Sequence, residues 1–266
     1  MKHSILDDII DFKVEEVKER KSLVPVKLLE KSIYFETPTI SLKEYVLRPD
    51  KSGIIAEIKR KSPSAGVIHP SVSIERISIG YMQAGASALS VLTDNKFFGG
   101  SNEDLSEARK YNFCPILRKE FVIDDYQIIE AKSIGADAIL LIASVLTEDK
   151  LKTFSEFARS LGLEVLVEVH KQGELYDCLN DVDLVGVNNR NLNTFETSID
   201  TSLNLISHLP GKVVKISESG ISDPETVSEL KNAGFQGFLI GGSFMKETRP
   251  EMACLQFIKA LNKLNS

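Results

Sequence analysis

A unit that ends in glycine recurs along the chain and limits what the chain can fold into. In its four clearest copies a polar helical pattern stops at a glycine and a short apolar run follows at once; the glycines are Gly85, Gly135, Gly162 and Gly234. Glycine is favoured just past a helix end because that position often needs a positive φ. The apolar run after it is too short for a helix. Each copy therefore predicts a helix, its cap and a buried strand.

Weaker copies of the unit bring the number of predicted strands to eight. Their starts lie 20 to 33 residues apart, which suits a strand, a helix and short loops. The segments between them carry apolar residues at helical spacing and open with Asp or Thr caps, as in 124–135, 147–162 and 223–234. The predicted strands are 53–58, 86–92, 114–119, 137–142, 163–169, 183–188, 212–217 and 236–241.

Eight strand and helix pairs predict the fold class. The strand runs are apolar on both faces, as in parallel strands covered by helices. We predict an α/β fold, a (β/α)8 TIM barrel over residues 46–266 that forms a single catalytic domain, with an N-terminal helical extension over residues 1–45. A doubly wound parallel sheet is the alternative, because it shows the same alternation.

Composition limits which classes of partner and which cellular compartment we expect for this protein. The 266 residues carry a formal net charge of −6, which argues against a nucleic acid as partner. The three cysteines are scattered, which is typical of a reducing compartment, so we expect a cytoplasmic protein without disulfides. The first 20 residues are charged throughout, and no later run reaches about 18 apolar residues. We therefore expect neither a signal peptide nor a membrane partner.

Ionisable residues lie at the carboxyl ends of the predicted strands, where parallel α/β folds place their active sites. Glu57, Lys119 and Glu168 stand within apolar runs, where an unpaired charge is costly. We expect these groups to meet each other or a ligand as tuned acids and bases. For any single residue, a buried ion pair or a solvent-facing position is the alternative. The strand-end set includes Glu57, Lys59, Lys119, Glu168, Asn188, Arg190, Glu218 and Ser219.

Neither a metal nor a nucleotide cofactor is expected. The four histidines lack HxH or HExxH spacing, and His170 is expected to be a loop residue or a neighbour of the site. The glycine-rich fingerprints of ATP and NAD sites are absent.

Glycines after the last two strands predict a phosphate site. Gly220 follows the seventh strand, and Gly241 and Gly242 follow the eighth. Barrels often bind phosphate there through backbone N–H groups. A simple turn is the alternative for either loop alone.

Two loops are predicted to line the mouth of the barrel, the open end at which the carboxyl ends of the strands meet. The segment 59–66 holds three cations and is expected to cross the mouth as a loop that clamps a carboxylate or phosphate. Phe97 and Phe98 follow the second strand and are expected to pack on a helix or on a flat ligand. Together the strand ends and loops are expected to gather the positive charge of Lys59, Lys61, Lys119 and Arg190 around an anionic small molecule.

The motifs at these strand ends resemble the indole-3-glycerol phosphate synthase family of tryptophan biosynthesis. The resemblance covers essentially the whole chain, including the helical extension. It is carried by the runs at 54–66, 90–101, 115–128, 135–146, 163–170, 186–192, 216–221 and 238–245.

The resemblance implies a reaction without a cofactor. Such enzymes convert 1-(2-carboxyphenylamino)-1-deoxyribulose 5-phosphate, a small anionic sugar phosphate, to indole-3-glycerol phosphate, CO₂ and water. By motif position, Lys119 is the implied general acid for ring closure. Lys59 is implied to bind the substrate anion and is a candidate acid for the later dehydration. Glu57 and Glu168 are implied to remove and relay protons, with their division of labour left open.

The remaining implied roles concern binding. Asn188 and Glu218, assisted by Ser219, hold sugar hydroxyls and orient the lysine. Ser62, Phe98 and Arg190 shape the substrate pocket, and Gly220, Gly241 and Gly242 give the phosphate its backbone donors. Family members vary at the position of Gly242, which can offer only its N–H group.

Two other functions stay open from the residues alone. A sugar-phosphate isomerase, such as phosphoribosylanthranilate isomerase, relies on a Cys or Asp acid/base pair, but no cysteine ends a predicted strand and Asp94 has no obvious partner. A catalytically silent phosphate-binding barrel is the other alternative, against which Lys119 and Glu168 argue.

The extension is expected to matter for function. Its helices, through Ile9, Ile10 and Phe12, are expected to cover the barrel or reach its mouth. Deletion of residues 1–45 should then raise KM or prevent folding. We expect a monomer, with at most a weak association with other enzymes of the pathway.

Overall fold

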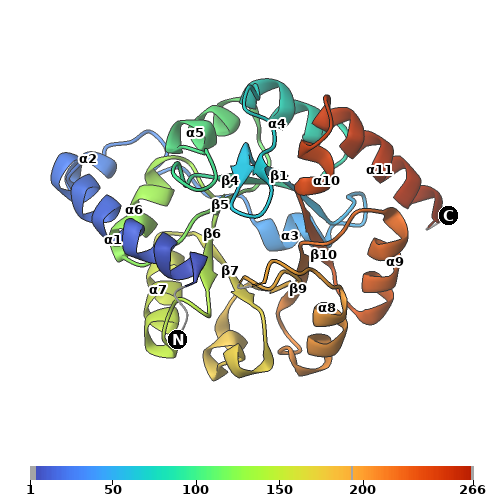
Figure 1. Ribbon diagram of the computed structural model, residues 1–266. Coiled ribbons are helices and arrows are strands. Elements are labelled where there is room, and N and C mark those ends of the chain that lie inside the picture. Colours follow the sequence, from blue (N-terminus) through green and yellow to red (C-terminus); the bar gives the residue numbers. More distant parts are fainter. Residues whose placement is uncertain (1–3, 193, 265–266) are drawn as a thin grey trace.

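Eight parallel strands close into a barrel in the computed structural model, which describes residues 4–192 and 194–264 (Figure 1). The first barrel strand pairs with both the last and the second, so the sheet closes on itself. The predicted (β/α)8 barrel is confirmed. The alternative of a doubly wound sheet is excluded, because such a sheet is open. The barrel strands are β1 (Ile54–Ile58), β4 (Ala88–Leu92), β5 (Ile116–Lys119), β6 (Ala138–Ile142), β7 (Glu164–Val169), β8 (Leu184–Asn188), β9 (Val214–Glu218) and β10 (Gly237–Ile240).

Helices surround the barrel (Figure 1). They are α1 (Ile5–Leu23), α2 (Val26–Leu29), α3 (Leu42–Leu47), α4 (Ile74–Gln83), α5 (Asn102–Tyr111), α6 (Asp125–Ser133), α7 (Glu148–Ser160), α8 (Asp200–Leu205), α9 (Pro224–Ala233), α10 (Gly242–Met245) and α11 (Pro250–Leu264). As predicted, Asp124, Thr147 and Asp223 cap α6, α7 and α9 by accepting backbone N–H bonds. The glycines of the four clearest repeats all have positive φ.

Two connections differ from the sequence expectation. Between β7 and β8 the chain forms two 3-10 turns, Gln172–Glu174 and Asp177–Asp181, in place of an α-helix. Gly173 lies in the first turn, and glycine disfavours helix. After β1, the predicted loop forms a small antiparallel hairpin of β2 (Lys61–Ser62) and β3 (Gly66–Val67).

Helix α3 fills the end of the barrel where the strands begin. Its Leu42 and Val46 are buried among Ile55, Leu184 and Val214, which lie near the starts of their strands. This helix also crosses residue 45, so the chain passes without a break from the extension into the barrel. Because α3 fills this end with apolar side chains, the carboxyl ends of the strands form the open end.

Helix α1 packs beside α6 and reaches the open end of the barrel. Tyr126 Oη donates to the carbonyl of Val24 at 2.8 Å, and Arg20 pairs with Glu130 at 3.2 Å. Ile9 is buried and forms part of the wall of the cavity at that end. The expectation that the extension reaches the mouth is confirmed.

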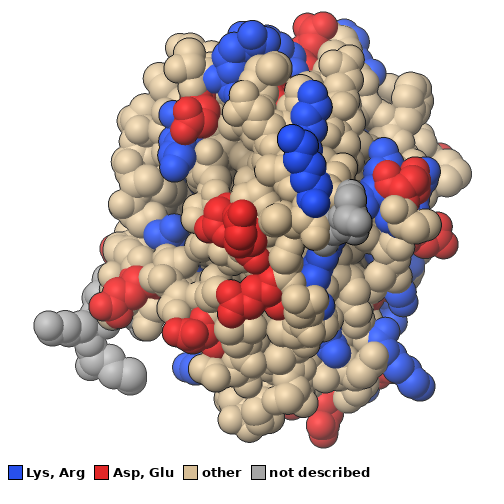
Figure 2. Space-filling model, turned by 90° about the vertical axis from the view of Figure 1, so that its right-hand side faces the viewer, with Lys and Arg blue, Asp and Glu red and all other residues tan. Residues whose placement is uncertain are grey.

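The surface carries both signs of charge. On the side that Figure 2 shows, basic and acidic side chains stand among neutral surface, and neither sign forms one continuous field. Among the residues that the structure describes, no helix is both long and apolar enough to cross a membrane.

Candidate active site

A cavity of about 490 Å³ occupies the open end of the barrel. Every barrel strand contributes to its wall near the carboxyl end of that strand. The structure brings the whole predicted set of site residues into this one cavity: Glu57, Lys59, Ser62, Phe98, Lys119, Glu168, Asn188, Arg190, Glu218, Ser219, Gly220, Gly241 and Gly242.

Four ionisable side chains form one layer of the barrel interior. They come from β1, β5, β7 and β9, which are every second strand around the barrel. In TIM barrels, alternate strands point their side chains into a common layer. Two residues earlier on the same strands, the layer beneath is apolar and consists of Ile55, Leu117, Leu166 and Ile216. The charged layer above it consists of Glu57, Lys119, Glu168 and Glu218.

Lys119 is the centre of this layer. Its Nζ lies 2.7 Å from Oε2 of Glu168 and 2.6 Å from Oε2 of Glu218. Burial alone would lower the pKa of Lys119, but the charges of the two glutamates raise it above its usual range. Lys119 is therefore a cation held between two carboxylates in the cavity.

The two glutamates that flank Lys119 differ in proton affinity. Burial would raise the pKa of Glu168, but Lys119 and His170 hold it well below its usual range, so Glu168 is an ionised base. Burial raises the pKa of Glu218 to about 7, and the charge of Glu168 adds to that rise despite the opposing effect of Lys119. Glu218 therefore exchanges its proton near neutral pH.

A glycine in β8 makes room for Glu218. A Cβ atom on Gly186 would overlap Oε1 of Glu218 and approach Leu166. Sequence reasoning missed this residue, although a glycine inside an apolar strand often marks a close approach of another group.

Residues after β8 extend the polar wall. Asn188 donates from Nδ2 to Oε1 of Glu168 at 3.1 Å and accepts the backbone N–H of Arg190 at 3.0 Å. The guanidinium of Arg190 donates to Oγ of Ser64 at 3.0 Å, so it lies against the β2–β3 hairpin. Arg190 and the hairpin thus close one side of the cavity together.

Backbone N–H groups and one further cation lie at the ends of β9 and β10, the two strands between β8 and β1 in the barrel. Ser219 and Gly220 both have positive φ, 66° and 75°, in the turn after β9. Gly242 begins the single turn of α10, whose first N–H groups have no partner within the helix. Lys246 also lines the cavity here, and sequence reasoning missed it.

The cations of the segment 59–66 do not all reach the cavity. Lys59 lines it and pairs with Glu57. Arg60 instead pairs with Asp104 of α5, and Lys61 donates to the backbone carbonyl of Lys96. The expectation that Lys61 adds charge to the mouth is therefore wrong, because its side chain bonds outside the cavity.

The two aromatic residues after β4 have separate partners. Phe97 packs edge-on against Phe12 of α1, with ring centroids 5.9 Å apart. Phe98 lines the cavity, and the centroid of its ring lies 5.8 Å from that of Phe121. Phe121 also lines the cavity, and sequence reasoning missed it. Together with Leu140 and other apolar lining residues, these rings give part of the cavity an apolar surface that suits a flat apolar group.

Glycine at position 241 provides the first test of this geometry. A Cβ there would overlap Oε1 of Glu57 and lie 2.8 Å from its Cβ, whereas a Cβ on Gly242 would meet open space. Gly241→Ala should displace Glu57 and lower kcat/KM by roughly 10- to 100-fold. Gly242→Ala is the matched control and should stay close to wild type. Equal kinetics in the two variants would contradict the packing described for Glu57.

His170 provides a test by pH. Its Nε2 lies 3.3 Å from Glu168 and its Nδ1 3.5 Å from Glu174, so it is a neighbour of the site as expected. Burial would lower the pKa of His170, but contacts with these glutamates raise it from 6.5 to about 9. The folded pKa exceeds the unfolded one, so the stabilisation is complete below pH 6.5 and is lost as pH rises through about 9.

His170→Gln should therefore lower the free energy of unfolding by about 1 to 3 kcal/mol at pH 6, and by less at pH 9. Urea unfolding at both pH values measures the change, with the exposed His208→Gln as control. The same loss at both pH values would show that the charge of His170 is not involved.

Comparison with known proteins identifies similar sequences over nearly the whole chain. A family model described as indole-3-glycerol phosphate synthase matches residues 6–257. The indole-3-glycerol phosphate synthase of Bacteroides thetaiotaomicron is 48% identical over 257 residues, which are 97% of this chain and 98% of that protein. The enzyme of the same name from Caldanaerobacter subterraneus is 44% identical and covers 91% of this chain and 93% of its own.

Solved structures show the same fold. A mutant form of the tryptophan synthase alpha-subunit from the hyperthermophile Pyrococcus furiosus superposes with a TM-score of 0.59 at 16% identity. The match covers 80% of this chain and 99% of that one. At this identity the likeness concerns the barrel alone.

Proposed function

The chain belongs to the indole-3-glycerol phosphate synthase family, and we propose how its residues divide the reaction of that family. The chain is a decarboxylating lyase of tryptophan biosynthesis. The isomerase and the silent barrel are thereby set aside. The observation that carries the proposal is the position of the Lys119 ammonium group between Glu168 and Glu218 inside the cavity.

Ring closure comes first. The aromatic carbon that bears the carboxylate attacks the ribulose carbonyl carbon, and Lys119 donates a proton to the oxygen on which charge develops. The attacked ring carbon becomes sp³, so loss of CO₂ restores aromaticity. The apolar wall and Phe98 hold the aromatic ring of the substrate.

Dehydration completes the indole. Lys59 protonates the leaving hydroxyl, and a glutamate removes the proton that the five-membered ring must lose. Glu168, as an ionised carboxylate, suits the base. Glu57 beside Lys59 and Glu218 with its pKa of about 7 suit the return of protons to the lysines.

Substrate binding falls to the groups around the charged layer. Asn188 and Glu218, with Ser219, hold the sugar hydroxyls, while Ser62 and Arg190 close the pocket over the substrate. The N–H groups of Gly220, Gly241 and Gly242 bind the phosphate, and the side chain of Lys246 adds a positive charge on that side.

The setting of the enzyme is part of the proposal. We place it in the cytoplasm as a monomer, with residues 46–266 as its catalytic domain and residues 1–45 as its extension. Its partner is the small anionic substrate rather than a nucleic acid or a membrane, with at most weak contact with other enzymes of the pathway.

A direct assay tests the activity. The chain contains no tryptophan, so indole formed from the carboxyphenylamino-deoxyribulose phosphate can be followed by fluorescence without an indole background. We expect turnover by the wild-type protein without added metal or cofactor. Absence of any indole product would overturn the proposal.

A further inference from the structure

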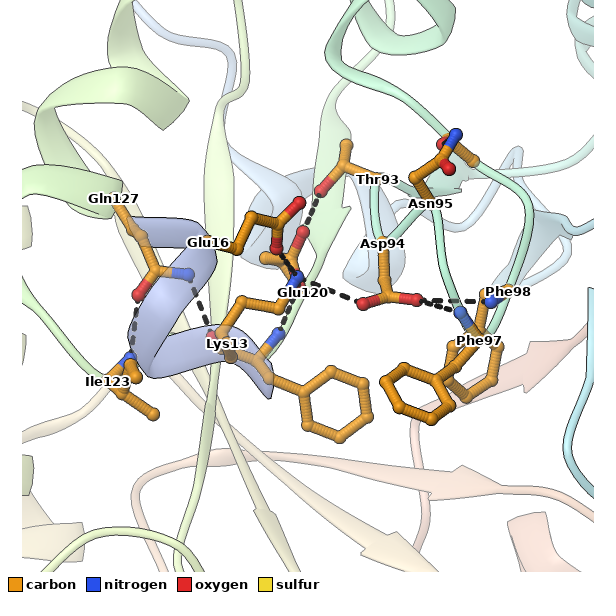
Figure 3. Close-up of polar contacts among 12 residues, drawn as sticks. Lys13, Glu16, Thr93, Asp94, Asn95, Phe97, Phe98, Glu120, Ile123 and Gln127 are labelled. Atoms are coloured by element: carbon orange, nitrogen blue, oxygen red, sulfur yellow. Dashed lines mark hydrogen bonds and ion pairs between the residues drawn. The ribbon is translucent and has the colours of Figure 1, made fainter. Parts of the chain in front are cut away.

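A lysine of the extension is buried among carboxylates behind the active site. The Nζ atom of Lys13 on α1 lies 2.5 Å from Glu16, 2.9 Å from Asp94 and 3.0 Å from Glu120. Its side chain is only 1% exposed. Figure 3 shows the lysine reaching from the helix to the loops that follow β4 and β5.

Asp94 connects Lys13 to the substrate cavity. One carboxylate oxygen of Asp94 contacts Lys13, and the other accepts the backbone N–H groups of Phe97 and Phe98 at 2.6 and 3.1 Å (Figure 3). The ring of Phe98 lines the cavity. The position of that ring therefore depends on a carboxylate whose other oxygen is held by α1.

Glu120 connects Lys13 to the neighbouring loop. It directly follows Lys119, and its Oε1 atom contacts Lys13 and accepts the backbone N–H of Phe121 at 2.8 Å. Its Oε2 accepts the hydroxyl of Thr93 at 2.8 Å. Lys13 thus joins the loop of Phe98 to the loop that begins at the catalytic lysine.

The contact between these two loops depends on the positive charge of Lys13. Burial would raise the pKa of Glu120, but Lys13 and Arg118 lower it, so Glu120 is ionised. Among the described residues, Lys13 is the only basic side chain within ion-pair distance of Asp94. Without Lys13, two buried carboxylates would stand side by side at the strand ends with too little positive charge.

We propose that Lys13 is a positioning residue for the reaction, which holds the loops after β4 and β5 so that Phe98 and Phe121 face the substrate. Lys13 does not line the cavity, so it acts through Asp94 and Glu120. The inference rests on the proposed function, because its readout is the KM of that reaction. Apolar residues of similar volume often replace a buried ion-pair cluster without loss of stability, so the role proposed for Lys13 concerns geometry rather than stability.

The first test compares two lysines of α1. Lys13→Met keeps an unbranched side chain that is one atom shorter and removes the charge, and it should raise KM roughly tenfold while kcat changes less than about threefold. Lys18→Met is the matched control, since the side chain of Lys18 is 78% exposed, and it should leave both constants unchanged. An active wild type together with an unchanged KM in Lys13→Met would overturn the inference without touching the proposed function.

A second set of variants separates position from charge. Asp94→Asn keeps an oxygen that can accept the N–H groups of Phe97 and Phe98, but it weakens the contact with Lys13. In this variant Lys13 still pairs with Glu16 and Glu120. This variant should fold and raise KM severalfold. Lys13→Met leaves buried carboxylates without their counter-charge and should lower Tm. Lys13→Met/Asp94→Asn removes one charge of each sign, so its Tm should lie above that of Lys13→Met while KM stays raised. A wild-type KM in either variant would show that Lys13 only balances charge, and the inference would fail.

Discussion

Lys119→Met is expected to lower kcat by about 10²- to 10⁴-fold, the range that removal of a general acid causes. The physical reason is the loss of the ammonium group that lies between Glu168 and Glu218 in the cavity. The methionine side chain cannot donate a proton to the developing oxyanion. Indole fluorescence under saturating substrate measures the effect.

Two controls isolate this effect from folding. Lys215→Met changes a lysine of β9 that lies outside the cavity, and it should keep near wild-type kcat. Lys119→Met also leaves Glu168 and Glu218 without their shared cation, which should lower Tm. Lys119→Met/Glu218→Gln removes one charge of each sign, so it should regain Tm but no activity. If Lys119→Met alone kept more than a tenth of wild-type kcat, Lys119 would be excluded as the acid.

The barrel was predictable because its signals are local. A glycine such as Gly135 or Gly234 must follow its helix end directly, and the strand follows the glycine. Every barrel strand overlaps its predicted range for this reason. The 3-10 turns between β7 and β8 were not predictable. A short α-helix and a 3-10 turn have similar sequence patterns, and tertiary packing decides which of the two forms.

The charged layer was predictable from the same periodicity. Glu57, Lys119 and Glu168 each follow an inward apolar residue by two positions on its strand, so closure of the barrel brings them together. The direction of side chains in loops was not predictable. Lys59 and Lys61 are alike in the sequence, yet only Lys59 lines the cavity.

Lys13 and its partners lay beyond sequence reasoning for a different reason. A lysine among the glutamates of a helical segment is typical of a solvated helix face, and its partners Asp94 and Glu120 are distant along the chain. Only the docking of α1 on the barrel turns this exposed pattern into a buried contact. The same docking gives Asp94 the partner that the sequence did not suggest.

Two truncations are expected to have different effects because the extension has two separate parts. Deletion of residues 1–24 removes α1, and with it the cavity wall formed by Ile5, Leu6 and Ile9 and the counter-charge of Lys13. The shortened protein should fold with a lower Tm and show KM raised at least about tenfold, since ground-state binding is lost. Removal of the buried Ile9 alone should cost about 1.5 to 3 kcal/mol.

Deletion of residues 1–45 also removes Leu42 and cuts α3 in two. Leu42 is fully buried in the barrel interior, so its loss adds a cavity that costs about 2 to 5 kcal/mol. Together with the loss of α1 this is a large part of the stability of a typical domain, and we expect the protein to be unfolded or aggregated. Circular dichroism and KM for both truncations measure the difference. Native Tm and KM after deletion of residues 1–24 would contradict the role of α1, and a folded barrel without residues 1–45 would contradict that of α3.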